Sequence, residues 1–235
     1  MPWLRVLPGL VVFGHLLIMA RKKTAVTAGL VESSVPVSSS TATFENQLKE
    51  RIDNLVKYAI CERSRVENEL EPFTPSDSEL ISLQSSGRAQ WLENRRDGIG
   101  SSDAPVISGV KSYGRTVHDI WAEKTRLHTE DPNKEIPDMI LFGTLLEPIV
   151  AQEFQRRNDG ISVFGGGELL RSKEFPFMQA TCDRFCKDET GEVGILEIKT
   201  SSSFNYELWI EDEPPPYVAV QTQHQLTVTG LEFAT

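Results

Sequence analysis

The sequence predicts an α/β fold, in which short strands and amphipathic helices share one core. The segment Val193–Lys199 is apolar and β-branched, which is typical of a strand. The segment Met139–Arg157 repeats apolar side chains at helical spacing, as expected of a long helix. With 235 residues, of which 39% are hydrophobic, the chain can bury one sizeable core.

Composition excludes some classes of protein. The net charge of −10 and the pI of about 5.0 argue against a broad basic surface that coats DNA, but not against a locally positive groove. The three cysteines, Cys61, Cys182 and Cys186, are too few for a disulfide framework and indicate a reducing compartment. They also exclude a four-thiolate iron–sulfur cluster within one chain.

Residues 1–43 are interpreted as a leader and a linker. Residues 3–20 are apolar but interrupted, and fall short of the ~20 continuous apolar residues that span a bilayer. A signal peptide has its basic residues before the apolar region, whereas here the basic cluster Arg21–Lys23 follows directly after it. A translation start at Met19 would instead make residues 1–18 a start-site artefact. These alternatives stay open, and residues 24–43 are expected to form a disordered linker.

Residues 44–89 are predicted to be a helical extension. Apolar residues recur at helical spacing over 44–60, which predicts an amphipathic helix that packs on the main domain or on a partner chain. Prolines then interrupt the pattern. A short helix is expected over 78–83, capped by Asp77 or Ser78.

Two arginines and a hydroxyl group flank a small-residue loop at the start of the main domain, which is expected to span residues 90–235. Arg95 and Arg96 end a predicted helix, and Ser102 lies in the loop that opens the next helix. Guanidinium groups and hydroxyls near a helix N-terminus are suited to binding a phosphate. A simple helix cap is the alternative, and the sequence of this segment alone favours it.

Two further helices are predicted before the strands. Val117–Arg126 is expected to place Ile120 and Trp121 toward the core. In the helix over Met139–Arg157, Glu147 stands within an apolar stripe. A buried carboxylate is costly unless it is compensated, and either a metal ion or, more commonly, an arginine can compensate it.

The predicted strands follow this helix. Ile161–Phe164 and Glu168–Arg171 are short strands around a run of three glycines. Phe175–Thr181 is expected to pair with Val193–Lys199, and the polar segment Lys187–Gly191 is expected to be a turn.

Three polar side chains are expected to meet at one end of this strand pair. Glu197 and Lys199 share a face because side chains two residues apart on a strand point the same way. Asp183 lies beyond the far end of the partner strand. Two carboxylates and a lysine are suited to binding a divalent metal beside a phosphate. Glu and Lys are common residues, so an ordinary surface strand end is the alternative.

The last predicted helix is Tyr217–Thr229. It presents Gln221 and Gln225 one turn apart, and Gly230 is its expected stop.

Five motifs stand in a fixed order along the chain: Arg-Arg-x-Gly-Ile-Gly-x-Ser-Asp-Ala from Arg95, Gly-x-Leu-Leu-Glu-Pro-x-Val from Gly143, the lone Asp183, Glu-Ile-Lys-Thr from Glu197, and Gln-x-Gln-His-Gln-Leu-x-Val-x-Gly from Gln221. Together they closely resemble the YqaJ-like viral recombinase family. These are phage-type alkaline exonucleases related to phage lambda exonuclease, within the PD-(D/E)xK nuclease superfamily. Each motif is weak singly, and the ordered set, over about Gln90–Thr235, is strong.

The resemblance implies a central mixed β-sheet flanked by helices, the restriction-endonuclease-like core, with metal at one sheet edge. It implies Mg²⁺, with Mn²⁺ as a substitute, bound by Glu147, Asp183, Glu197 and the Ile198 carbonyl. It also implies catalytic roles for Asp183, Glu197, Lys199 and Gln221, with Lys199 orienting or activating the attacking water. Arg95 or Arg96, with Ser102, match the family's 5′-phosphate grip.

The expected function is therefore a metal-dependent exonuclease that degrades one strand of linear duplex DNA, 5′ to 3′, in phage-type recombination. Expected partners are double-stranded DNA, a single-strand annealing protein and a homo-oligomeric ring, in the host cytoplasm and away from membranes. A structure-specific or restriction-like endonuclease shares the fold and is one alternative. A catalytically degenerate DNA-binding relic is the other.

Two features depart from the family pattern. Cys182 replaces the proline that precedes the aspartate in the superfamily motif, a position expected to tolerate change. The sequence stops at Thr235, where relatives continue into at least one more strand. We therefore expect a domain truncated at its C-terminus.

Overall fold

A computed structural model describes residues 57, 73–82, 87–110, 114–127, 137–201, 209 and 213–235. The elements are, in chain order, β1 (Ser78–Ser82), α2 (Arg88–Arg95), α3 (Ala104–Ile107), α4 (Val117–Lys124), α5 (Asp138–Arg157), β2 (Ser162–Phe164), β3 (Leu169–Ser172), β4 (Gln179–Thr181), β5 (Arg184–Lys187), β6 (Val193–Leu196) and α6 (Pro216–Thr229). The helices expected on the main domain are all present.

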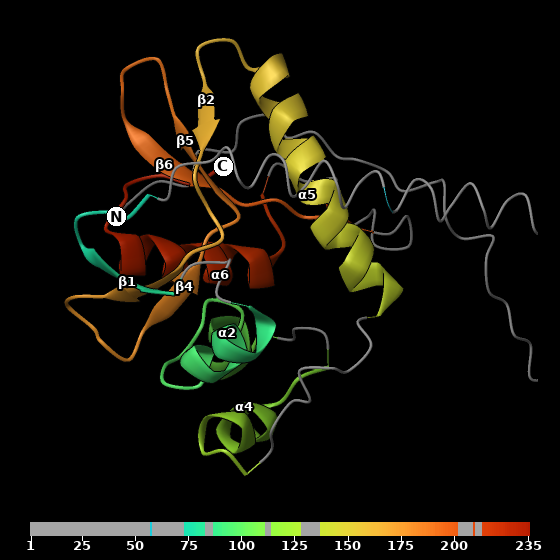
Figure 1. The fold of residues 1–235 in the computed structure, drawn as a ribbon, viewed down its shortest axis with the longest axis vertical. Coiled ribbons are helices and arrows are strands. Elements are labelled where there is room, and N and C mark those ends of the chain that lie inside the picture. The colour runs from blue at the N-terminus through green and yellow to red at the C-terminus, as the bar shows by residue number, and fades with distance from the viewer. Residues whose placement is uncertain are drawn as a thin grey trace, which may run out of the picture.

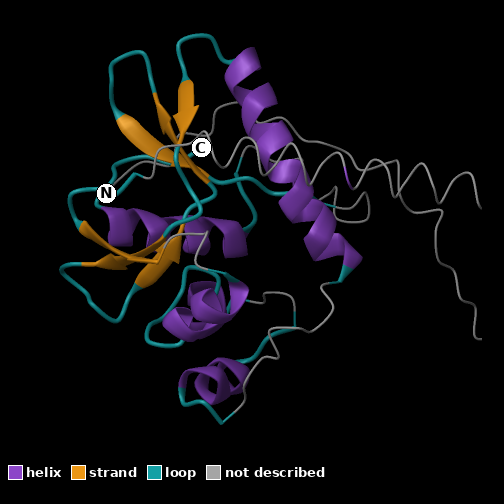
Figure 2. Cartoon of the chain, in the orientation of Figure 1, coloured by secondary structure: helices purple, strands orange, loops and turns teal. Residues whose placement is uncertain are grey.

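The described strands form two three-stranded antiparallel sheets, in the orders β1-β3-β4 and β2-β5-β6. Helices pack beside both sheets (Figure 2), and this combination of helices and sheets confirms the predicted α/β class. Parallel pairing enters through isolated bridges, Ile99 with Met178 and Ile195 with Ala234. Among the described residues, these two bridges are the only parallel pairing, and all pairings between named strands are antiparallel.

Helix α6 crosses the molecule between the two sheets (Figure 1). Its Leu226 and Val228 belong to a buried apolar cluster that also contains Leu170 of one sheet and Phe185 and Ile195 of the other. Burial of this surface against both sheets fixes the position of α6. The helix ends at Gly230, whose left-handed backbone (φ 69°) is the expected stop.

Helix α5 packs on the β2-β5-β6 sheet through a second apolar cluster. Ala151 and Phe154 of α5 contact Cys186 and Leu196 of the sheet, together with Phe233 near the end of the chain. The helix continues through Pro148. Its packing brings the middle of α5, where Glu147 lies, toward the sheet.

The chain changes sheets at Cys182–Asp183, between β4 and β5. The expected pairing of Phe175–Thr181 with Val193–Lys199 is therefore wrong: β4 pairs with β3, and β6 pairs with β5. The predicted turn after Lys187 instead closes the β5–β6 hairpin, where the Asp188 carboxylate accepts hydrogen bonds from the Thr190 and Glu192 amides.

Two other expectations are wrong. Residues 78–82 form strand β1, not a short helix, because β1 completes a sheet with β3. Trp121 is 51% exposed, whereas Ile120 is buried as expected. An eight-residue helix buries one narrow face, and Ile120 takes it.

The apolar leader, the linker and the amphipathic helix expected over 44–60 lie outside the described residues, apart from Lys57. None of the helices in the described part of the chain has the length and hydropathy needed to cross a bilayer.

We predict that Gly166→Ala destabilises the fold strongly. Gly166 has φ 102°, and an added Cβ would overlap the Asp183 carbonyl and lie 2.8 Å from the Arg184 Cα. Gly109 also has a positive φ (79°), but a Cβ added there would have no heavy atom within 4 Å. Gly109→Ala therefore measures the cost of the backbone strain alone, without a steric overlap. Urea unfolding should show a loss of about 1–2 kcal/mol for Gly109→Ala and about 3 kcal/mol or more for Gly166→Ala. Equal losses would contradict the close approach.

Candidate active site

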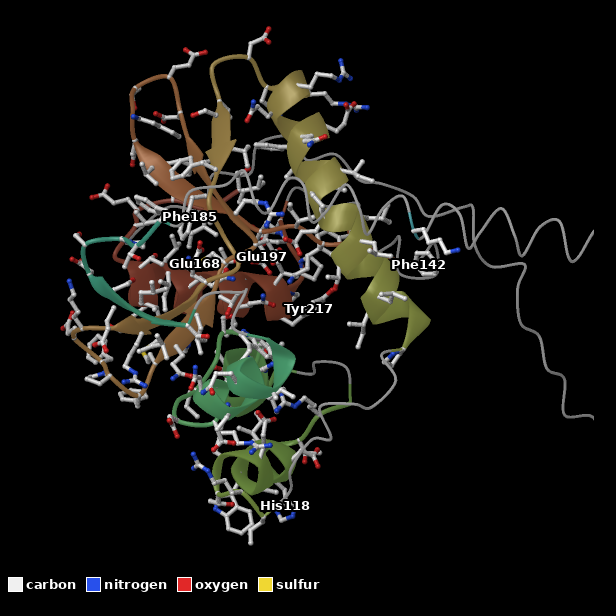
Figure 3. The ribbon with its side chains drawn as sticks, viewed as in Figure 1. His118, Phe142, Glu168, Phe185, Glu197 and Tyr217 are labelled. Carbon is white, nitrogen blue, oxygen red and sulfur yellow. The ribbon has the colours of Figure 1, made fainter. Side chains whose placement is uncertain are left out.

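The carboxylate of Glu197 is the centre of the site. Glu197 follows β6, and its side chain is only 4% exposed. Its Oε1 accepts hydrogen bonds from the Lys199 ammonium and from Gln221 Nε2 at 2.5 Å. Its Oε2 accepts one from Gln225 Nε2 at 2.7 Å. In Figure 3, Glu197 is labelled near the middle of the molecule, over α6.

Asp183 lies beside Glu197 at the point where the chain changes sheets. Its Oδ2 accepts a hydrogen bond from the Ile198 amide at 2.7 Å, which ties it to the segment after β6. Burial raises the pKa of Asp183 well above its usual range, and the nearby Glu197 and Glu147 carboxylates raise it further. Lys199 and the Ile198 amide oppose this shift.

Glu147 enters the site from α5 and is compensated by an arginine. Its Oε1 lies 2.7 Å from Nη1 of Arg184, whose side chain is 2% exposed. Arg184 also donates to the Asp183 carbonyl. Of the two compensators expected for Glu147, a metal ion or an arginine, the structure has the arginine. Nothing in the sequence singled out Arg184 beyond its place next to Asp183.

The donor set suits a hard divalent cation. In the described part of the chain, no group of three or more His, Cys, Asp or Glu side chains is arranged to hold a metal ion. Mg²⁺ does not need one, since it is usually held by one or two carboxylates and keeps several waters. Asp183 and Glu197 supply two such groups. Glu147 is a third carboxylate close enough to raise the pKa of Asp183, together with burial and Glu197.

A second cluster forms around the buried Asp103. Its carboxylate lies 2.7 Å from Arg115, 3.0 Å from Lys124 and 3.6 Å from Arg95. Burial acts to raise the pKa of Asp103, but the three cations and the Gly100 amide together hold it below its usual value. Arg115 and Lys124 also pair with Glu123, so the three cations of this cluster are held by buried and half-buried carboxylates.

The structure distinguishes the two arginines of the expected phosphate grip. Arg95 Nη2 donates to Ser102 Oγ at 2.7 Å, and its guanidinium lies over the Trp91 ring, 5.1 Å from the centroid. Arg96 pairs instead with Glu93 at 2.6 Å. Of the two, only Arg95 is brought to Ser102.

Comparison with known proteins adds independent information. The model of the YqaJ-like viral recombinase domain matches residues 90–232. The chain belongs to this family. It is also similar to the "Uncharacterized protein YqaJ" of Bacillus subtilis (strain 168), with 38% identity over 163 residues, which are 68% of this chain and 49% of that protein. The chain therefore spans about half the length of the curated relative it matches.

The YqaJ-like region contains both clusters. The Arg95–Ser102 pair lies near its start, and the match extends past Glu147, Asp183 and Glu197 to the end of α6. Strand β1 lies outside the matched residues although it pairs with β3 inside them. The sheet therefore uses residues on both sides of the family boundary.

We predict that Asp183→Asn stabilises the metal-free YqaJ-like chain at pH 8. Because the folded-state pKa is raised, the Asp183 contribution to stability is present below the unfolded pKa of about 3.8 and is lost as pH rises through the folded pKa. Asparagine avoids that loss, so the free energy of unfolding should rise by about 0.5–2 kcal/mol. Urea unfolding in EDTA measures it, and the gain should shrink toward pH 4. A loss of stability at pH 8 would contradict this account.

Proposed function

We propose that this chain is a Mg²⁺-dependent deoxyribonuclease that hydrolyses linear duplex DNA exonucleolytically, 5′ to 3′, in phage-type recombination. The observation that carries the proposal is the contact of the Lys199 ammonium with Glu197, next to the Asp183 carboxylate that the Ile198 amide holds. Family membership supports a recombination role. Mn²⁺ is the expected substitute for Mg²⁺.

Each residue has a role that follows from its chemistry. Asp183 and Glu197, with the Ile198 carbonyl, would hold the cation, and Glu147, paired with Arg184, would be the third acidic ligand, from α5. Lys199 would place a positive charge where a water and the scissile phosphate meet. Gln221 fixes the Glu197 carboxylate by its 2.5 Å hydrogen bond. These contacts set the carboxylate and the ammonium before substrate arrives.

The reaction is the addition of water to phosphorus. A P–O bond of the DNA backbone breaks, and the proton lost by the water balances the proton gained by the leaving oxygen. Bound Mg²⁺ would lower the pKa of the water and stabilise charge on the phosphate. Lys199 would orient or activate the water beside the phosphate.

The Arg95–Ser102 pair is proposed to bind the 5′-terminal phosphate. Its guanidinium is oriented by Trp91, Ser102 and Asp103, so little side-chain freedom is lost on binding an anion. A site that reads a strand end favours exonuclease over endonuclease action. The partners in this proposal are duplex DNA, a single-strand annealing protein and further copies in a ring, in the host cytoplasm. The family resemblance supports the last two partners.

We predict metal-dependent loss of linear duplex DNA. The full chain is incubated with linear and closed circular duplex in Mg²⁺ or in EDTA, and only the linear DNA with Mg²⁺ should disappear. Lys199→Ala should lower the rate by about 10²-fold or more in protein whose circular dichroism shows that it is folded at the assay temperature. Cutting of the circle would show an endonuclease. No cleavage by a folded chain would indicate a DNA-binding relic, and full activity of Lys199→Ala would remove the lysine from the mechanism.

We predict that Arg95 and Arg96 differ. Arg95→Met should raise the KM for 5′-phosphorylated linear DNA about tenfold or more and reduce the preference over 5′-hydroxyl ends, because it removes a charge-assisted contact. Arg96→Met is the matched control, since Arg96 pairs with Glu93, and should change the KM by less than twofold. Steady-state digestion of both substrates measures this. Equal effects of the two variants would contradict the assigned grip.

A further inference from the structure

Gln225 contacts the same carboxylate as Gln221 but in a different way. Its side chain is fully buried, whereas Gln221, one turn earlier on α6, is partly exposed. Gln225 Nε2 donates to Glu197 Oε2 at 2.7 Å and to the Thr181 carbonyl at 3.1 Å. In the sequence, Gln225 is distinguished only by its spacing from Gln221.

The orientation of the Gln225 amide follows from its neighbours. A carboxylate and a backbone carbonyl can only accept hydrogen bonds, so the NH₂ end must face both of them. Each of its two hydrogens then has one acceptor. The amide is fixed at both hydrogens, and it links α6 to the end of β4 and to the segment after β6.

The donors on Glu197 are distributed unequally. Among the described residues, Lys199 and Gln221 both donate to Oε1, and Gln225 alone donates to Oε2. Each carboxylate oxygen has two acceptor sites. Oε1 is therefore fully used, whereas Oε2 keeps one acceptor site, and Gln225 determines which way that site points.

We infer that Gln225 is a positioning residue that orients the Oε2 atom of Glu197 for binding a divalent cation. The inference rests on the proposed metal-dependent function and assigns Gln225 no contact with substrate or metal. Hydrogen-bonded partners of metal ligands commonly change metal affinity 10–100-fold when they are removed. Loss of the Gln225 amide should weaken cation binding without removing a ligand.

The test measures cation binding by the full chain without DNA. Isothermal titration with MgCl₂ compares the wild type with Gln225→Met, which has a similar length but no N–H donors. Gln223→Met is the matched control, since Gln223 is exposed on the same helix. Gln225→Asn, whose amide is one methylene too short to keep both contacts, gives the same comparison if Gln225→Met does not fold. Calorimetric melting checks the fold of each variant.

The dissociation constant of Mg²⁺ should rise about tenfold or more in Gln225→Met and by less than twofold in Gln223→Met. In DNA digestion, the Mg²⁺ concentration for half-maximal rate should rise likewise, and saturating Mg²⁺ should restore the rate to within about threefold. A packing defect would lower the rate at every Mg²⁺ concentration.

Two negative results are distinguishable. If the wild type binds Mg²⁺ and a folded Gln225→Met variant binds it equally tightly, this inference is overturned and the proposed function is left intact. No Mg²⁺ binding by the wild type would overturn the proposed metal dependence and this inference with it.

Discussion

The buried guanidinium of Arg184 is the constraint on which the site depends. Arginine stays protonated even when buried, so its side chain, 2% exposed, requires an anion close by. Glu147 supplies that anion from α5. Removing either partner of a buried pair typically costs about 3–5 kcal/mol, because the other is left as an uncompensated charge. This pair therefore fixes a long helix against β5 and places a third carboxylate near Asp183.

Charge of opposite sign gathers at two separate places in an acidic chain. Carboxylates concentrate around Asp183, whereas cations concentrate around Asp103. The net charge of −10 describes neither place. Local fields of this kind decide where a cation or a phosphate binds, and the sum over the chain bears mainly on solubility and long-range association.

Helix α6 links the carboxylates around Asp183 to the cations around Asp103 through a chain of hydrogen bonds. Gln221 and Gln225 hold Glu197, while His224 lies between them in sequence and contacts the Gln179 carbonyl at 3.0 Å. Gln179 in turn donates through Nε2 to the Asn94 carbonyl at the end of α2, next to Arg95. One rigid helix thus sets the position of the carboxylate centre relative to the cationic cluster.

The sequence predicts the parts of this fold that depend on local patterns. The apolar periodicity of α5, the glycine after α6 and the two-residue spacing that puts Glu197 and Lys199 on one face are all local. The change of sheet at Asp183 is not, because β4 and β5 are too short to show which partner each will take. The roles of Arg184 and Gln225 could not be predicted for the same reason. Their partners, Glu147 and Glu197, are 37 and 28 residues away in the sequence.

The residues Phe233–Thr235 lie along β6, and this has a consequence for handling the protein. The Ile195 amide donates to the Phe233 carbonyl, and the Glu197 amide donates to the Thr235 carbonyl at 3.0 Å. Without these three residues, β6 would become an open sheet edge, and open edges are templates for self-association. Protein shortened at this end would therefore lose the backbone hydrogen bond that holds Glu197 and would expose a strand edge prone to aggregation. An assay of such protein would then register loss of soluble protein as loss of activity.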